Sequence, residues 1–244
     1  LALQSNTTGD QNTANGSKAL QFNTGSKNTA VGYYALNFNV DGFDNTAIGS
    51  LALAKSTTAY GNTATGSLAL TTNIDGGQNT AHGYAALFGN ISGNNNTSMG
   101  TNSLSSNTTG SLNVAIGSTA LQINTSGNNN TAIGFGADVN SGNLSNATVI
   151  GYNATANNAN SMIFGNGNVT TWGFGRTSVG SGGALQVGSN AANGNAAYLS
   201  SGGVWTNASD STKKDAITNL DGTDILSKLK QLPITRWKYK GTNE

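Results

Sequence analysis

The hydrophobic positions of the sequence recur in short segments at a fixed spacing, and each segment ends in a glycine. Its commonest form is Asn-Thr-Ala-x-Gly, and the glycines are separated by 16 residues once and then by 17 residues six times. They are Gly16, Gly32, Gly49, Gly66, Gly83, Gly100, Gly117 and Gly134, with looser copies ending at Gly151 and Gly165. Because self-similarity at a fixed period is typical of repeat architectures, residues 1–165 are predicted to form a stack of equivalent coils.

A second short segment follows each glycine and ends in a leucine, as in Ser50-Leu-Ala-Leu53. A polar turn comes next, usually with a glycine such as Gly42 or Gly76. We therefore expect each period to contain a strand, a bend, a second strand and a loop. A period of 17 residues is too short for a helical hairpin repeat, whereas it suits one coil of a β-solenoid or β-roll, whose coils lie about 4.8 Å apart.

The recurring alanines and leucines predict a thin core. The leucines form one row of equivalent positions: Leu20, Leu36, Leu53, Leu70, Leu87, Leu104 and Leu121. The apolar residues that precede the glycines are expected to join them in the interior: Val31, Ile48, Met99, Ile116, Ile133 and Ile150. A buried aliphatic side chain contributes about 1.5–3 kcal/mol, against about 1–2 kcal/mol per residue of lost backbone entropy. Such a thin core predicts that the coils self-associate and bury a second face.

Composition excludes several classes of function. Among 244 residues only 9% are charged and the net charge is +1, so we expect neither a nucleic-acid partner nor a polybasic membrane anchor. The absence of cysteine excludes disulfides, thiolate metal sites and a cysteine nucleophile. No apolar run approaches the roughly 18 residues of a spanning helix, so membrane insertion is not expected. The repeat pattern is already under way at Leu1, and we expect the chain to be part of a longer protein.

A row of threonines accompanies the alanines at equivalent positions: Thr13, Thr29, Thr46, Thr63, Thr80, Thr97 and Thr131. One interpretation is a flat array of hydroxyl groups of the kind that ordered-water binding requires. The interpretation that we favour is that these hydroxyls, together with the preceding asparagine side chains, satisfy backbone groups at the turns.

No metal or other cofactor is expected. Asp41, Asp44, Asp75 and Asp138 do not recur at one coil position, as a calcium-binding repeat would require. His82 is the only histidine and has no second ligand at a useful spacing. His82 is interpreted as a member of the row formed by the variable position of the pentapeptide.

The recurring Asn-Thr-Ala-Ile-Gly followed by Ser-x-Ala-Leu resembles the YadA-type head repeats of trimeric autotransporter adhesins over residues 1–165. This resemblance implies a left-handed parallel β-roll, three copies of which pack side by side into a homotrimeric head that binds host surfaces. The period of mostly 17 residues is longer than is usual for that head, so larger outer loops are expected.

Residues 166–208 lose the period and become rich in Gly, Ser and Asn, with short β-like pieces at 169–174 and 184–187. They resemble the β stalk in front of the chaperone domain of phage tail fibres, in which three chains interleave. That resemblance implies that Trp172, Phe174 and Trp205 pack between chains. Trp172 and Trp205 are also candidate sugar-binding residues.

Residues 209–244 are lysine-rich and predict a short α+β segment. Ile225, Leu226, Leu229 and Leu232 form a helical apolar stripe that ends before a proline, and an alternating strand follows. The stretch starting at Ser209 resembles the first part of the self-cleaving intramolecular chaperone domain of endosialidases and phage tail fibres.

The chaperone resemblance implies a catalytic dyad in which Ser209 is the nucleophile and Lys214 the base. A lysine with a lowered pKa accepts the serine proton, so that the serine attacks the adjacent backbone carbonyl of the Ala208–Ser209 bond. Thr212 and Lys213 depart from the family pattern, and only about a 36-residue part of the domain is present. The alternative is that Ser209 caps a turn and Lys214 is a solvated amine.

Together these features predict an extracellular homotrimeric fibre, on a cell surface or in a virion tail, that attaches to a glycan or receptor of a target cell. A bacterial adhesin and a bacteriophage tail fibre remain open. An ice-binding β-roll is a third alternative. A polysaccharide-degrading enzyme would need paired carboxylates in a groove, whereas the 10 acidic residues are scattered. No turnover enzyme is expected.

Overall fold

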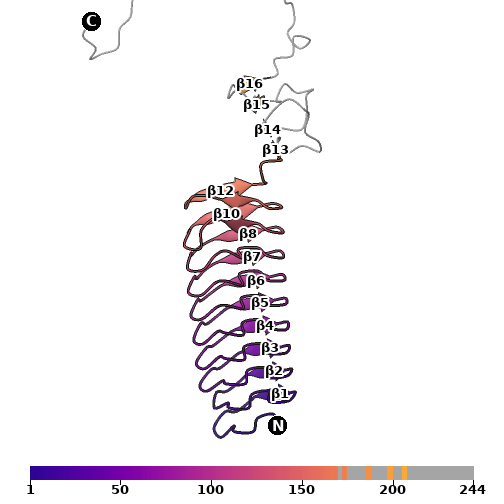
Figure 1. The fold of residues 1–244 in the computed structure, drawn as a ribbon, viewed down its shortest axis with the longest axis vertical. Helices are drawn as coiled ribbons and strands as arrows, with labels where there is room; N and C mark the ends of the chain where they lie inside the picture. The colour runs from indigo at the N-terminus through magenta and orange to yellow at the C-terminus, as the bar shows by residue number, and fades with distance from the viewer. Residues whose placement is uncertain (170–171, 175–184, 188–196, 200–204, 208–244) are drawn as a thin grey trace, which may run out of the picture. The chain divides into compact units, whose positions relative to one another are not determined.

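The protein is described by a computed structural model that covers residues 1–169 and the short strands at 172–174, 185–187, 197–199 and 205–207. The chain divides into two compact units, Leu1–Val169 and Thr170–Glu244. In the first unit, successive coils stack one above the other in a parallel β-solenoid (Figure 1). The predicted all-β parallel solenoid with about 17 residues per coil is confirmed, since Thr46 pairs with Thr63 and Thr63 with Thr80.

One ten-stranded parallel sheet follows the length of the solenoid, with one short strand from each coil. Its strands are β1 (Thr13–Asn15), β2 (Thr29–Val31), β3 (Thr46–Ile48), β4 (Thr63–Thr65), β5 (Thr80–His82), β6 (Thr97–Met99), β7 (Val114–Ile116), β8 (Thr131–Ile133), β10 (Ala147–Ile150) and β12 (Ser161–Phe164). A second, two-stranded sheet joins β9 (Asp138–Val139) to β11 (Thr155–Ala156). The register places each residue of a strand beside its equivalent in the next coil.

The segment after each glycine is a run of turns, so the predicted second strand is wrong for most coils. Leu53 and Leu70 have φ angles of 50° and 53°, in the left-handed region. This conformation costs about 1–2 kcal/mol per residue, yet it keeps the coils bonded, because Leu53 N–H donates to Ala69 O at 3.0 Å. Extended pairing occurs here only in the last coils, at β9 and β11.

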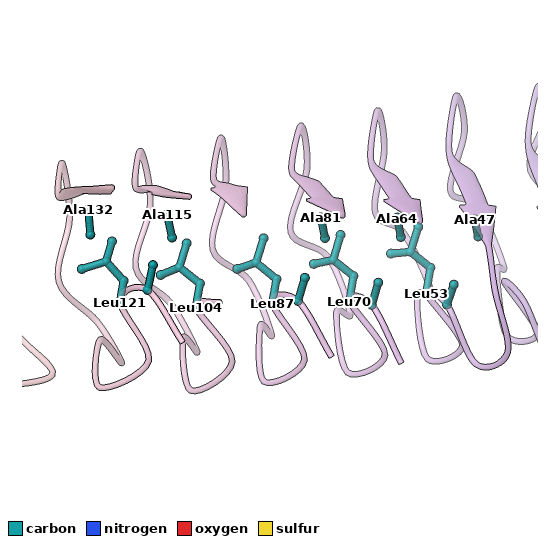
Figure 2. Packing of buried hydrophobic residues seen from close by; sticks show 14 of the residues in the cluster. Ala47, Leu53, Ala64, Leu70, Ala81, Leu87, Leu104, Ala115, Leu121 and Ala132 are labelled. Atoms are coloured by element: carbon teal, nitrogen blue, oxygen red, sulfur yellow. The ribbon is translucent and has the colours of Figure 1, made fainter. Parts of the chain in front are cut away.

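The core is built from leucine and alanine. The seven predicted leucines are fully buried. Figure 2 shows that Leu53, Leu70, Leu87, Leu104 and Leu121 point toward the strands on the opposite side of the coil, which carry alanines such as Ala64 and Ala81. The prediction that the residues before the glycines join this core is wrong: Ile48 is 42% exposed and Met99 47% exposed. Side chains alternate between the two faces of a strand. With Ala47 and Ser98 pointing inward, their neighbours must point outward.

A row of buried asparagines ties each loop to the sheet. The row contains Asn28, Asn45, Asn62, Asn79, Asn96, Asn113 and Asn130. Asn62 Nδ2 donates to Gly76 O at 2.9 Å, and Asn62 Oδ1 accepts the backbone N–H of Asn79 at 2.9 Å. One side chain thus closes its own loop and bonds to the next coil. The prediction that asparagine side chains satisfy backbone groups is confirmed.

A second row of buried asparagines lies where the chain leaves the leucine segment. The row consists of Asn23, Asn39, Asn73, Asn90, Asn107 and Asn124, with Ser56 at the equivalent position of one coil. Asn90 Nδ2 donates to Gly93 O at 3.0 Å and to Asn73 Oδ1 at 2.7 Å. Neighbouring coils are therefore linked by a chain of amides that Ser56 interrupts.

The row of leucines ends at Asp138, which is buried at the equivalent position of the following coil. Its carboxylate accepts the backbone N–H of Val139 at 2.8 Å and of Ile123 at 3.1 Å. Burial nevertheless raises the pKa of Asp138 from 3.8 to about 6. The folded solenoid therefore binds this proton more tightly than the unfolded chain does.

The raised pKa of Asp138 predicts a pH-dependent stability. Between about pH 4 and pH 6 the folded state holds more protons than the unfolded state, so the free energy of unfolding falls as the pH rises through this window. We expect a higher urea midpoint at pH 4 than at pH 7, and a smaller difference in Asp138→Asn. A midpoint that is equally pH-dependent in both proteins would contradict this assignment.

The second unit contains a four-stranded sheet. Its strands are β13 (Trp172–Phe174), β14 (Leu185–Val187), β15 (Ala197–Leu199) and β16 (Trp205–Asn207). β13 and β14 are parallel, whereas β14, β15 and β16 pair antiparallel. The short β pieces predicted at 169–174 and 184–187 contain two of these strands. The predicted α+β segment at 209–244 lies outside the described residues.

Candidate functional site: an uncharged face of the solenoid

One side of the solenoid carries no charge. Between residues 29 and 137, the strands, the glycine bends and the following segments up to the core leucine contain no Asp, Glu, Lys or Arg. The four charged residues in this range lie elsewhere in their coils: Asp41, Asp44, Lys55 and Asp75. We call the outward side chains of the strands and of the residue after each glycine the uncharged face. It contains three rows of equivalent positions.

The first row, the Thr row, comprises Thr13, Thr29, Thr46, Thr63, Thr80, Thr97, Val114, Thr131 and Thr148 in register. The favoured interpretation of these hydroxyls was wrong, because none of them hydrogen-bonds to another group within residues 1–169. Thr57 and Thr108, in the loops, do bond to backbone carbonyls of the next coil. The strand hydroxyls are left to solvent or a ligand.

The second row, the apolar row, lies two residues further along each strand. It comprises Asn15, Val31, Ile48, Thr65, His82, Met99, Ile116, Ile133 and Ile150. Ile48, Met99, Ile116 and Ile133 are between 37% and 47% exposed. Met99, Ile116, Ile133 and Ile150 are adjacent in register and form an unbroken aliphatic strip, which Thr65 and His82 separate from Val31 and Ile48. An exposed aliphatic strip of this kind marks an interaction surface. His82 belongs to this row, as predicted, and its side chain is exposed.

The third row, the bend row, consists of the residues that follow the glycines: Ser17, Tyr33, Ser50, Ser67, Tyr84, Thr101, Ser118, Phe135 and Tyr152. The glycines that position it have φ angles near 135°, such as Gly66 at 134° and Gly83 at 135°. The aromatic members are more than half exposed: Tyr33 is at 54%, Tyr84 at 53%, Phe135 at 53% and Tyr152 at 64%. The rings of Phe135 and Tyr152 stack with centroids 5.7 Å apart.

The loops carry aromatic pairs of a different kind. Phe43 and Tyr60 occupy equivalent positions of adjacent coils and stack with centroids 5.4 Å apart. Outside the loops, in the segments that follow Gly16 and Gly32, the Lys18 ammonium donates to the Tyr34 hydroxyl and lies 4.6 Å from the centre of the Tyr34 ring. This hydrogen bond raises the pKa of Lys18 and lowers the pKa of Tyr34. Each of these contacts involves only neighbouring coils.

The site residues predicted from the sequence lie in the second unit. Trp172 is the first residue of β13 and Trp205 the first of β16, so both are in strands of one sheet, but their side chains lie outside what the structure describes. Ser209 and Lys214, the predicted dyad, also lie outside the described residues. Those assignments stay predictions.

Metal-binding and membrane-spanning elements were also sought in the described part of the chain. No group of three or more His, Cys, Asp or Glu side chains comes together there to hold a metal ion. No helix in that part is long and apolar enough to cross a membrane.

Comparisons with protein-family models, with curated proteins and with solved structures found no match to this chain. The uncharged face is therefore the feature of the described residues that bears on function. Sequence reasoning placed the apolar row in the core and did not single out the bend row. The signal for the bend row was present, because aligning the coils on their glycines puts Tyr33, Tyr84 and Phe135 in one column.

Proposed function

We propose that the protein is one protomer of an extracellular homotrimeric attachment fibre, on a cell surface or in a virion tail. The observation that carries the proposal is the apolar row, whose aliphatic side chains, above all Met99, Ile116 and Ile133, stay exposed on the sheet of a single chain. Three copies that turn this row toward a common axis would shield it from water. Three equivalent binding surfaces on one rod would then act with high effective concentration on a target cell.

The composition of the core supports association. Inside the described solenoid the large buried aliphatic side chains come mainly from the one leucine row, while the strands contribute alanine. A coil of this kind buries little apolar area for the number of residues that it orders. Packing of the apolar row against two further copies would add buried apolar area without changing the conformation of the coil.

Sedimentation tests the trimer and its interface. We expect the intact chain to sediment with three times its mass of 24.6 kDa. Ile116→Lys combined with Ile133→Lys should give a monomer, because each trimer would otherwise bury six unpaired ammonium groups. The matched control is Ile74→Lys with Ile91→Lys, since these loop residues are 43% and 42% exposed and should leave the trimer intact. A monomeric wild-type protein rejects the proposal.

The C-terminal segment is proposed to drive trimerisation and then to cut itself off between Ala208 and Ser209. The support is the resemblance of the stretch from Ser209 to Lys214 to the chaperone dyad. This is a single event on the protein's own chain and not turnover. Mass spectrometry of the freshly expressed chain should show a cut that Ser209→Ala abolishes. Identical intact masses for both proteins would reject self-cleavage.

A second candidate function is the binding of ordered water or ice. The observation that favours it is the Thr row, whose hydroxyls have no partner within the described solenoid and repeat with the spacing of the strands, about 4.8 Å. An attachment fibre is expected to show no thermal hysteresis. A measurable hysteresis that is lost in Thr63→Lys would favour the ice-binding alternative over the fibre.

A further inference from the structure

The aromatic residues of the bend row recur with a longer period than the coils. Tyr33, Tyr84 and Phe135 are separated by 51 residues, which is three periods of 17. The backbone hydrogen bonds verify that these positions are equivalent, since the residue after each bend-row residue donates to the bend-row carbonyl of the preceding coil, as Leu51 N–H does to Tyr33 O at 2.8 Å. From Tyr33 to Phe135 the row therefore carries an aromatic ring at every third coil, and Tyr152, in the coil after Phe135, stacks on that last ring.

The coils between these rings carry only hydroxyl side chains. Ser50 and Ser67 lie between Tyr33 and Tyr84. The next interval, which ends at Phe135, contains Thr101 and Ser118. With coils about 4.8 Å apart, each interval is about 14 Å long. The row thus presents two equal intervals, each bounded by aromatic rings and lined with two hydroxyl groups.

The side chains of the bend row, aromatic rings and hydroxyl groups, indicate the class of ligand that it binds. Aromatic rings can contact the apolar faces of sugar rings, and serine and threonine hydroxyls can form hydrogen bonds with sugar hydroxyls. Small-molecule sites combine apolar surface with a few polar groups in the same way. Between residues 29 and 137 the uncharged face offers no cation to an acidic glycan and no carboxylate to a basic partner, and the Lys18 ammonium near its N-terminal end is bonded to the Tyr34 hydroxyl. Because the aromatic rings recur at a constant distance of about 14 Å, the row suits a polymer whose own units recur at a constant distance.

We infer that the bend row binds a neutral linear polysaccharide that lies along the axis of the solenoid. The inference rests on the proposed attachment function and assigns its ligand class to a defined surface. Each aromatic interval engages the same feature of the polymer, so weak contacts at successive intervals combine on one chain. The predicted tryptophans of the second unit are not needed for this contact.

The experiment replaces the rings with the residue that other coils already use. The test variant carries Tyr33→Ser, Tyr84→Ser and Phe135→Ser, because serine occupies the equivalent position of four other coils and fits the bend. The control variant carries Phe43→Ser and Tyr60→Ser, which removes the exposed loop pair. Serine also occurs at their coil position, as Ser26 and Ser111.

The probes are cellulose, chitin, soluble starch and xylan as neutral polymers, and alginate and hyaluronan as acidic ones. Depletion from solution and affinity electrophoresis measure binding of the full chain. We expect at least one neutral polymer to bind and the acidic polymers not to bind. The test variant should bind that polymer about tenfold more weakly or worse, whereas the control variant and Tyr84→Phe should bind like the wild type.

Sedimentation of the same variants separates this inference from the trimer. A wild-type trimer that binds none of the neutral polymers overturns the inference and leaves the fibre proposal standing. A monomer whose polymer binding is lost in the test variant supports the inference and rejects the trimer. Loss of both trimer and binding in the test variant overturns the inference, because the row would then be an interface between copies of the chain.

Discussion

Gly66→Ala is expected to disrupt the solenoid at its centre. Gly66 has a φ angle of 134°, a region that is essentially restricted to glycine, and a Cβ built on it lies 2.4 Å from Gly83 O and 2.7 Å from Gly83 C. Backbone strain of this kind costs about 1–3 kcal/mol, and the overlap with backbone adds to it. We expect a loss of at least about 3 kcal/mol in the free energy of unfolding, measured by urea titration with circular dichroism.

A second glycine provides the matched control for Gly66. Gly61 has a φ angle of 63°, and a Cβ there meets nothing closer than 3.6 Å. Other coils have Lys27, Asp44 and Asn95 at this position with φ angles between 55° and 60°. Gly61→Asn should therefore be neutral or stabilise the protein by up to about 1 kcal/mol, because it restricts the unfolded chain. Equal urea midpoints for the two variants would show that the stacked glycines tolerate a side chain.

The stack of coils could be predicted because it depends only on the spacing of residues along the sequence. Equally spaced glycines such as Gly49 and Gly66 fix the coil length, and coils of equal length align equivalent residues whatever the details of the chain between them. The buried leucine row followed from the same alignment. The number of coils and the register of their strands needed no knowledge of side-chain direction.

The direction of the strand side chains was not predictable from hydrophobicity. Ile48 is more apolar than Ala47, yet Ala47 is buried and Ile48 is exposed. Leu53 on the opposite side of the coil points toward the strands (Figure 2), and the inward strand position is occupied by a small residue, mostly alanine, in the coils that carry a core leucine. Alternation then forces the larger residue outward. The strongest candidate interface was therefore first assigned to the core.

The second strand that was predicted in the leucine segments was wrong for a related reason. A run such as Ser50-Leu-Ala-Leu53 has the alternation of a strand, and a leucine with positive φ is uncommon enough that no sequence pattern favours it. In the solenoid, Leu51 at 61° and Leu53 at 50° turn the chain so that one leucine enters the core. Hydrogen bonds between coils stabilise that conformation, and the sequence of one period does not reveal them.

Restoring the interrupted asparagine row is the second large effect that we expect, and it requires two substitutions together. Within the described residues, Asn39 Oδ1 and Ser56 Oγ are buried without a hydrogen-bond partner. In regular coils an asparagine at the position of Ser56 would donate to Asn39 Oδ1, as Asn90 does to Asn73 Oδ1 at 2.7 Å. Leaving a buried polar group unpaired costs about 1–3 kcal/mol.

The position of Ala59 explains why the row is interrupted. Regular coils have glycine three residues after the asparagine, and a Cβ at Gly76 would lie only 2.5 Å from Asn73 Oδ1. Ala59 carries that Cβ, so an asparagine at position 56 has no room. Serine and alanine in this coil are therefore a matched pair that replaces the asparagine and glycine of the others.

A double-mutant cycle tests this coupling. Ser56→Asn alone should destabilise the protein by about 1–3 kcal/mol through overpacking. Ala59→Gly alone should cost about 0.5–1 kcal/mol through the added freedom of the unfolded chain. The double variant should exceed the wild type by about 1–2 kcal/mol, because the amide chain from Asn39 to Asn73 becomes continuous. Changes in the free energy of unfolding, measured by urea titration, that add within about 0.5 kcal/mol would show that the two positions are independent.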